Sequence, residues 1–144
     1  MSAKGLEVID HSAQLTHEWV NELTERLGWS RHRDALRLLR VTLTGIRDHI
    51  GHDELVQFGA QLPLLIRGMY YEGWKHSATP VRGTDGFFEA LEKSLSKVTD
   101  YRGPVDVGQV FALLDNHVSR GELDDVRSGL PKEIRELWPT STHV

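Results

Sequence analysis

The sequence contains no cysteine among its 144 residues. This absence excludes a disulfide framework, a zinc site with thiolate ligands and a cysteine nucleophile. No uncharged apolar run approaches the roughly 18 residues that a membrane-spanning helix requires. The opening segment MSAKGLEVIDHSAQL has no basic stretch followed by an apolar core, so it does not resemble a secretory signal. We therefore expect a cytoplasmic protein that neither crosses nor binds a membrane.

Positive charge is also in deficit. Lys and Arg number 17 against 21 for Asp and Glu, so the net charge is 17 − 21 = −4. This balance argues against binding nucleic acid over the whole surface and leaves only a local basic patch for such a role. A glycine-rich phosphate loop, a G-x-S-x-G turn and an H-E-x-x-H motif are all missing. The sequence thus indicates no catalytic residue and no cofactor, and it favours a non-enzymatic role.

The spacing of apolar residues predicts a long central helix. Its steps of three and four place one apolar stripe along about four turns, formed by Leu36, Leu39, Leu43, Ile46 and Ile50. Ser30 is expected to cap the N-terminus of this helix, and Gly51 is expected to end it.

Further helices are predicted on both sides of the central one. An earlier helix should run from about Ser12 to Leu27 and end at Gly28. After Gly51, one helix should cover about 53–61, and another should open at Pro63, since proline is tolerated at a first helical position. Because the elements predicted along the chain are helices, the fold class is expected to be all-α.

The pattern of the first half recurs after 68 residues. Aligning Pro63 with Pro131 gives 131 − 63 = 68, and seven of the 23 positions from Asp48 to Tyr70 are then identical in both copies. About one or two identities would arise by chance. We therefore predict one domain over 1–144, a compact bundle of two tandem repeats with three to four helices each. Repeat one covers about 6–74, the linker about 75–83 and repeat two about 84–138, with a pseudo-twofold axis between the repeats.

Two segments carry a resemblance to a known family. FGAQLPLLIRGMYYEGW in the first half and HVSRGELDDVRSGLPKEIRELW in the second are similar to the bacterial domain-of-unknown-function 2267 family (DUF2267), over about Leu6 to Trp138. The resemblance implies an all-helical fold. It implies no activity, catalytic residue or binding residue.

Paired histidines and glutamates are the candidate metal ligands. His49 and Glu54 in the first repeat correspond to His117 and Glu122 in the second. These are typical metal ligands, and symmetry could unite the two pairs in a metal-binding enzyme or sensor. The alternative interpretation is structural, with each histidine in the last turn of a helix and each glutamate in the first turn of the next. In the second repeat Ser119-x-x-Glu122 matches a capping box.

A row of arginines follows the outer side of the long helix. Arg33, Arg37, Arg40 and Arg47 are spaced by 4, 3 and 7 residues, opposite the apolar stripe. Such a row could bind an anion, a nucleic acid or an acidic protein. The alternative is a solvated face without a ligand, which is the ordinary state of charged residues on a helix.

Tyr70, Tyr71 and Trp74 form an aromatic cluster at the end of the first half, and Trp138 corresponds to Tyr70 in the second repeat. Aromatic residues are enriched at interfaces, but in a duplicated fold we expect them rather to seal the junction between the repeats, with Arg67 and Arg135 stacked on them. Because the informative residues are those needed for packing and capping, we predict a protein-interaction or regulatory module, whose contact surface would contain Tyr71, Trp74 or the arginine row. Its expected partner is another protein or a second copy of the chain.

Overall fold

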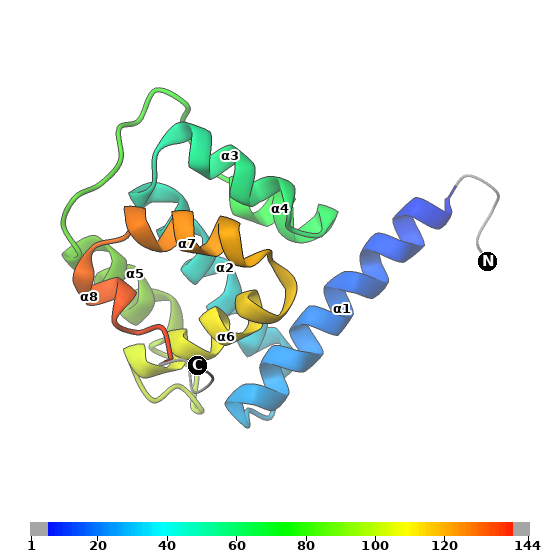
Figure 1. The fold of residues 1–144 in the computed structure, drawn as a ribbon. Coiled ribbons are helices and arrows are strands. Elements are labelled where there is room, and N and C mark those ends of the chain that lie inside the picture. Colours follow the sequence, from blue (N-terminus) through cyan, green and yellow to red (C-terminus); the bar gives the residue numbers. More distant parts are fainter. Residues whose placement is uncertain (1–5, 140–144) are drawn as a thin grey trace.

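The computed structural model describes residues 6–139, in which every regular element is a helix and no strand occurs. Figure 1 shows the order of the elements, which are α1 (Glu7–Leu27), α2 (His32–His49), α3 (His52–Ala60), α4 (Leu64–Tyr71), α5 (Asp85–Leu95), the 3-10 turn η1 (Pro104–Asp106), α6 (Val107–His117), α7 (Arg120–Gly129) and α8 (Lys132–Arg135). The predicted all-α class is confirmed. None of the helices in this described part has both the length and the apolar character needed to cross a bilayer.

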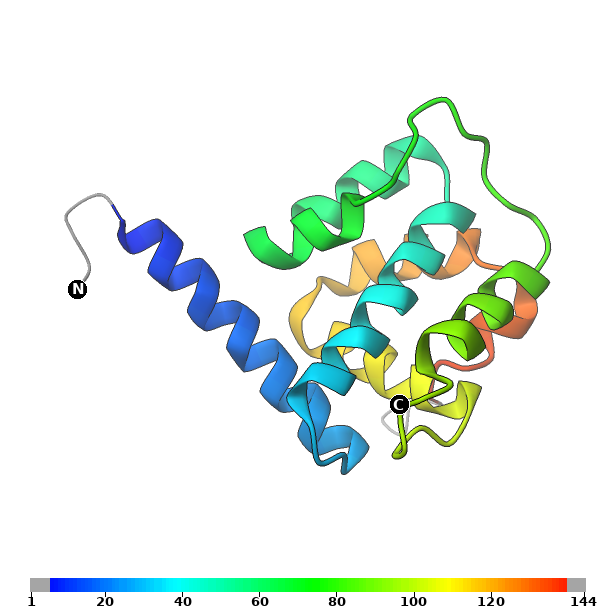
Figure 2. The same cartoon turned by 180° about the vertical axis from the view of Figure 1, so that it is seen from behind.

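Helix α2 forms the centre of the core. It contacts α1, α4, α5 and α6, and in Figure 2 it crosses the middle of the molecule. Leu39, Leu43 and Ile46 of the predicted stripe are fully buried. Leu36 is only half-buried, and Leu38 takes its place in the core. Because neighbouring helices surround α2 on several sides, its buried surface is wider than one stripe.

Several predicted boundaries agree with the structure. Gly28 ends α1 with a φ of 70°, a left-handed conformation that glycine adopts without strain. Pro63 directly precedes α4, and α3 lies within one residue of the predicted range. Helix α1, however, begins at Glu7 instead of about Ser12. Acidic residues in its first turn favour this earlier start.

The predicted cap of α2 is wrong. Arg31 occupies the cap position in extended conformation and makes no side-chain cap hydrogen bond. Ser30 instead donates from its backbone N and its Oγ to Asp100 Oδ2, at 2.9 and 3.0 Å. The hydroxyl is therefore used in a contact between distant segments, which local spacing cannot reveal.

The helix boundaries recur at a spacing of 68 residues. Corresponding boundaries are the ends of α1 and α5 at Leu27 and Leu95, the ends of α2 and α6 at His49 and His117, and the starts of α4 and α8 at Leu64 and Lys132. Helix α5 contacts α2 of the first half, and α1 contacts α6 of the second half. This pattern is consistent with the predicted repeats.

The segment between α4 and α5 corresponds to the predicted linker and contains no helix. It lies against the C-terminal end of α2, where Val81 N donates to Asp48 O at 2.8 Å. His52 Nε2 lies 2.9 Å from Ala78 O in the same segment. The linker thus has fixed contacts with the first half.

Candidate functional site

His49 at the end of α2 is buried between backbone carbonyls. Its Nδ1 lies 2.7 Å from Gly45 O, and its Nε2 lies 2.8 Å from Gly83 O. A metal ligand needs a free lone pair on one ring nitrogen, and here both nitrogens face acceptor oxygens. The side chain therefore connects the end of α2 to the linker.

His117, the corresponding residue of α6, has different neighbours. Its Nε2 lies 2.8 Å from Glu22 Oε1 on α1, and its ring stacks on Trp19 with 4.7 Å between centroids. Burial alone would raise the pKa of Glu22, but hydrogen bonds from His117, Arg26 and Asn116 outweigh it and lower that pKa. The histidine holds α6 against α1, and the structure does not bring it together with His49.

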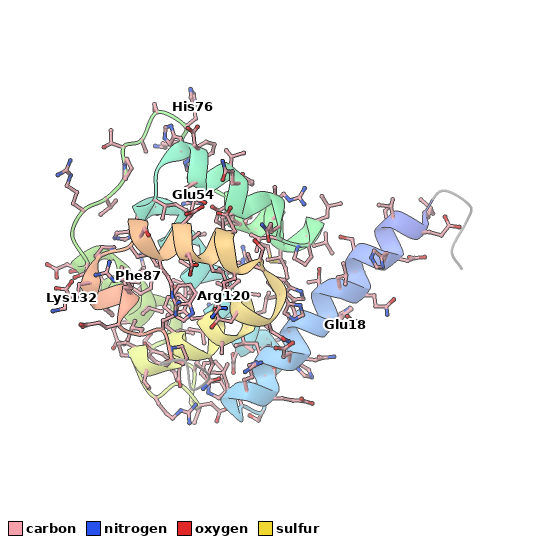
Figure 3. All side chains as sticks on the ribbon, in the orientation of Figure 1. Glu18, Glu54, His76, Phe87, Arg120 and Lys132 are labelled. Atoms are coloured by element: carbon pink, nitrogen blue, oxygen red, sulfur yellow. The ribbon has the colours of Figure 1, made fainter. Side chains whose placement is uncertain are left out.

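The two glutamates of the predicted set do come together. Helices α3 and α7 lie side by side, and Figure 3 shows Glu54 in the space between them. Glu122 on α7 is only 8% exposed. One carboxylate oxygen from each of Glu54, Glu122 and Asp125 lies within 4.8 Å of the other two. Asp125 follows Glu122 by three residues and so shares its helix face.

This cluster has an unusual charge state. Glu54 Oε2 and Glu122 Oε2 are buried, and no donor group in the described residues reaches them. Burial, the hydrogen bond shared with Glu54 and the negative charges of Glu54 and Asp125 together raise the pKa of the Glu122 carboxyl to about 8. A proton on the Glu122 carboxyl would give this cluster a donor that the other residues described do not provide.

Only half of the predicted capping box forms. Ser119 Oγ accepts a hydrogen bond from Glu122 N at 3.3 Å, as predicted. The Glu122 carboxyl does not return to Ser119 N, which donates instead to Gln61 Oε1 at 2.8 Å. Gln61 Nε2 also donates to Ser119 Oγ. Gln61 thus accepts the backbone hydrogen bond that Glu122 would accept in a capping box, and the Glu122 side chain faces Glu54 instead. Local spacing does not signal this replacement, because Gln61 is distant in the sequence.

Three of the predicted arginines share a groove. Arg33, Arg37 and Arg40 are exposed on α2 and line a groove of about 540 Å³ together with Leu36, Val41 and Thr44 of α2, Met69 and Glu72 near the end of α4, and Ala90 and Ser94 of α5. Arg40 pairs with Glu72. Within residues 6–139, neither Arg33 nor Arg37 forms an ion pair. The groove therefore presents two unneutralised guanidinium groups beside apolar side chains.

The fourth arginine of the row has a structural role. Arg47 is only 7% exposed and donates from Nη1 to Tyr70 O and Glu72 O, at 2.8 and 2.7 Å. These carbonyls end α4 and lack partners within that helix. Arg47 thus satisfies the end of α4 and adds no charge to the groove.

The predicted aromatic surface is half-buried. Tyr71 and Trp74 pack against the hydrophobic core and against each other, with 5.7 Å between ring centroids. Arg67 does not stack on them but donates to carbonyls at the end of α3, and Arg135 donates to Leu130 O. Among the described residues, Arg127 stacks on an aromatic ring, with its guanidinium 4.3 Å from the Trp138 ring centroid. Its spacing from Trp138 in the sequence gave no signal of this contact.

Comparison with known proteins gives a family match. No curated protein matches the chain. The family model described as "Uncharacterized conserved protein (DUF2267)" matches residues 16–137, which include both segments that carried the resemblance. Because this match covers most of the sequence, the chain belongs to the DUF2267 family.

Proposed function

We propose that this protein is a non-enzymatic interaction module, which binds an acidic, partly apolar segment of a protein partner in the groove between α2, α4 and α5. The observation that carries the proposal is the position of Arg33 and Arg37, unpaired in the described residues, beside the apolar side chains of Leu36 and Val41. Guanidinium groups bind carboxylates through two parallel hydrogen bonds, so carboxylates are their natural complement.

The net charge of the chain makes this groove distinctive. The protein as a whole carries −4, so an acidic partner is repelled by most of the surface and attracted where the arginines gather. Charge complementarity of this kind guides association and selects the partner. The same argument weighs against a long nucleic acid, whose charge would extend beyond the groove onto acidic surface.

The dimensions of the groove suit a peptide segment. Arg33 and Thr44 are 44 − 33 = 11 residues apart on one helix, which corresponds to about 16 Å at a rise of 1.5 Å per residue. That length matches about three turns of a partner helix lying in the groove, with apolar side chains against α2 and carboxylates beside the arginines. A small anion would contact only one or two of these residues.

The direct test uses a labelled amphipathic helical peptide with glutamates on one face and leucines on the next, and a matched peptide with lysine in place of glutamate. We expect the acidic peptide to bind the unaltered protein with an affinity that falls as the salt concentration rises. The R33E/R37E variant should bind the same peptide much more weakly. The control is R82E, which reverses a charge at an exposed arginine of the linker. Equal affinity of the acidic peptide for the unaltered protein, R33E/R37E and R82E would contradict the proposal. Tighter binding of a single-stranded DNA probe than of the peptide would favour the nucleic-acid alternative.

We also propose that the two halves are tandem repeats related by a pseudo-twofold axis. Adding 68 to Trp19 gives Phe87, and adding 68 to His49 gives His117. His117 stacks on Trp19, while His49 contacts the edge of Phe87 at 6.1 Å between centroids, so the two contacts exchange under the repeat. Glu54 and Glu122 are likewise equivalent and meet each other.

The expected cytoplasmic location remains part of the proposal, and the cysteine-free sequence agrees with it.

A metal site built on His49 and His117 is not part of the proposal. The ring nitrogens of His49 face two backbone carbonyls, and His117 contacts Glu22 on a different helix. The groove contains no histidine and no candidate nucleophile beside a general base, which favours binding over catalysis.

A further inference from the structure

We propose that Glu54, Glu122 and Asp125 form a binding site for a divalent cation of the calcium, magnesium and manganese class, between α3 and α7. The site is separate from the arginine groove. It joins one residue of the first half to two residues of the second, so its occupation would strengthen the contact between the halves.

The arrangement of the three carboxylates is the first support. One oxygen from each lies within 4.8 Å of the other two, which a single ion between them could bridge. Glu122 and Asp125 are three residues apart on α7 and face the same side, while Glu54 approaches from α3. Two elements fixed by the fold therefore supply the ligands.

The burial of Glu122 is the second, independent support. The residue is 8% exposed, and its Oε2 lies shielded from solvent without a hydrogen-bond donor. Buried carboxylate oxygens are normally paired with donors or coordinate metals, because unpaired burial costs several kcal/mol. Glu54 Oε2 is in the same position. A cation or a shared proton between the two carboxylates would satisfy both acceptors.

The protein itself supplies no such charge. The ion pairs found within residues 6–139 do not involve Glu54, Glu122 or Asp125. The bridge is therefore a proton or a cation from solution. Asp125 is exposed and gives an ion a path to the buried oxygens.

The ligand chemistry selects the class of ion. All three ligands are carboxylates, and oxygen-only sites prefer calcium, magnesium or manganese to zinc or copper, which favour histidine and thiolate. Three carboxylates leave coordination positions for water, as is common in sites of moderate affinity.

The test is a titration of the metal-free full-length protein with MnCl2. Calorimetry and the relaxation of water protons around bound Mn²⁺ measure the binding. We expect one ion per chain, with a dissociation constant on the order of 10⁻⁴ M or tighter. E54Q and E122Q should each weaken binding about tenfold or more. Both variants should remain folded, because glutamine keeps the shape of the side chain and adds a donor for the remaining carboxylate.

The matched control is D124N, which removes one acidic charge from the exposed position next to Asp125. D124N should bind Mn²⁺ as the unaltered protein does. Equal weakening in D124N and E122Q would show only a general attraction of surface acids and would overturn the site. Failure of the unaltered protein to bind stoichiometrically would overturn it as well. Neither result bears on peptide binding to Arg33 and Arg37.

Discussion

Glu122 is the residue whose environment departs most from that of an ordinary surface carboxylate. Burial and the neighbouring Glu54 and Asp125 raise its pKa from 4.5 to about 8, so the folded protein retains a proton that the unfolded chain releases. This contribution to stability is complete below pH 4.5, where both states are protonated. It declines as the pH rises towards 8, because the folded state must then give up its extra proton.

We therefore predict that the free energy of unfolding of the metal-free protein falls between pH 4.5 and about 8, and that E122Q removes most of this fall. Above pH 8, E122Q should unfold at a temperature several degrees higher than the unaltered protein. A difference of ~1 kcal/mol in the free energy of unfolding corresponds to roughly 3–5 °C in a domain of this size. Thermal unfolding followed by circular dichroism in the presence of a chelator measures both quantities. D124N should keep the original pH dependence, and an unchanged dependence in E122Q would show that Glu122 is not the group responsible.

The sequence predicted part of this chemistry. The repeat spacing singled out Glu54 and Glu122 together, because equivalent residues near a pseudo-twofold axis can meet. It also offered both histidines as ligands, whereas the structure uses His49 and His117 in other contacts. Asp125 was not among the candidate ligands, because its role depends on the distance between α3 and α7. That distance arises from packing and leaves no local pattern.

At the scale of elements, α2 and α5 meet at a position where no side chain fits. A Cβ atom added to Gly45 of α2 would lie 2.5 Å from Cδ1 of Phe87, whose ring is buried. Glycine inside a helix is unfavourable by about 1 kcal/mol relative to alanine. Close packing of the two helices is the compensating gain.

Gly45→Ala should therefore destabilise the protein by about 1–3 kcal/mol, the usual consequence of overpacking, despite its better helix propensity. Gly68→Ala is the matched control, because its Cβ would meet nothing within 4 Å on the exposed side of α4. We expect this control to stabilise the protein by about 0.5–1 kcal/mol. Urea denaturation measures both, and a G45A variant as stable as G68A would contradict the packing described for α2 and α5.

Elements defined by local chemistry were predicted well, and those defined by distant contacts were not. Gly28 and Pro63 fixed the end of α1 and the start of α4, because both residues restrict the backbone directly. The first turns of α1 were missed because Val8 and Ile9 are exposed there and give no buried stripe. In Figures 1 and 2 this end of α1 projects away from the other helices.

At the scale of the whole molecule, both candidate sites combine residues of the two halves. The groove joins arginines of α2 to Ala90 and Ser94 of α5, and the carboxyl cluster joins Glu54 to Glu122. The repeat in the sequence predicted that the halves meet, but the arginine row alone did not reveal that α5 completes a groove. We infer that each half depends on the other for its core as well as for its site.

The central claim is thus that the halves fold only together, and separate production of fragments 1–78 and 79–144 tests it most directly. The cut lies in the helix-free segment between α4 and α5, so no helix is interrupted. Fragments of this length are marginally stable even with a complete core. We predict that each alone gives a weakly helical circular dichroism spectrum without a cooperative unfolding transition, and that an equimolar mixture regains the helicity and the transition of the intact protein. Cooperative unfolding of either fragment by itself would contradict the account.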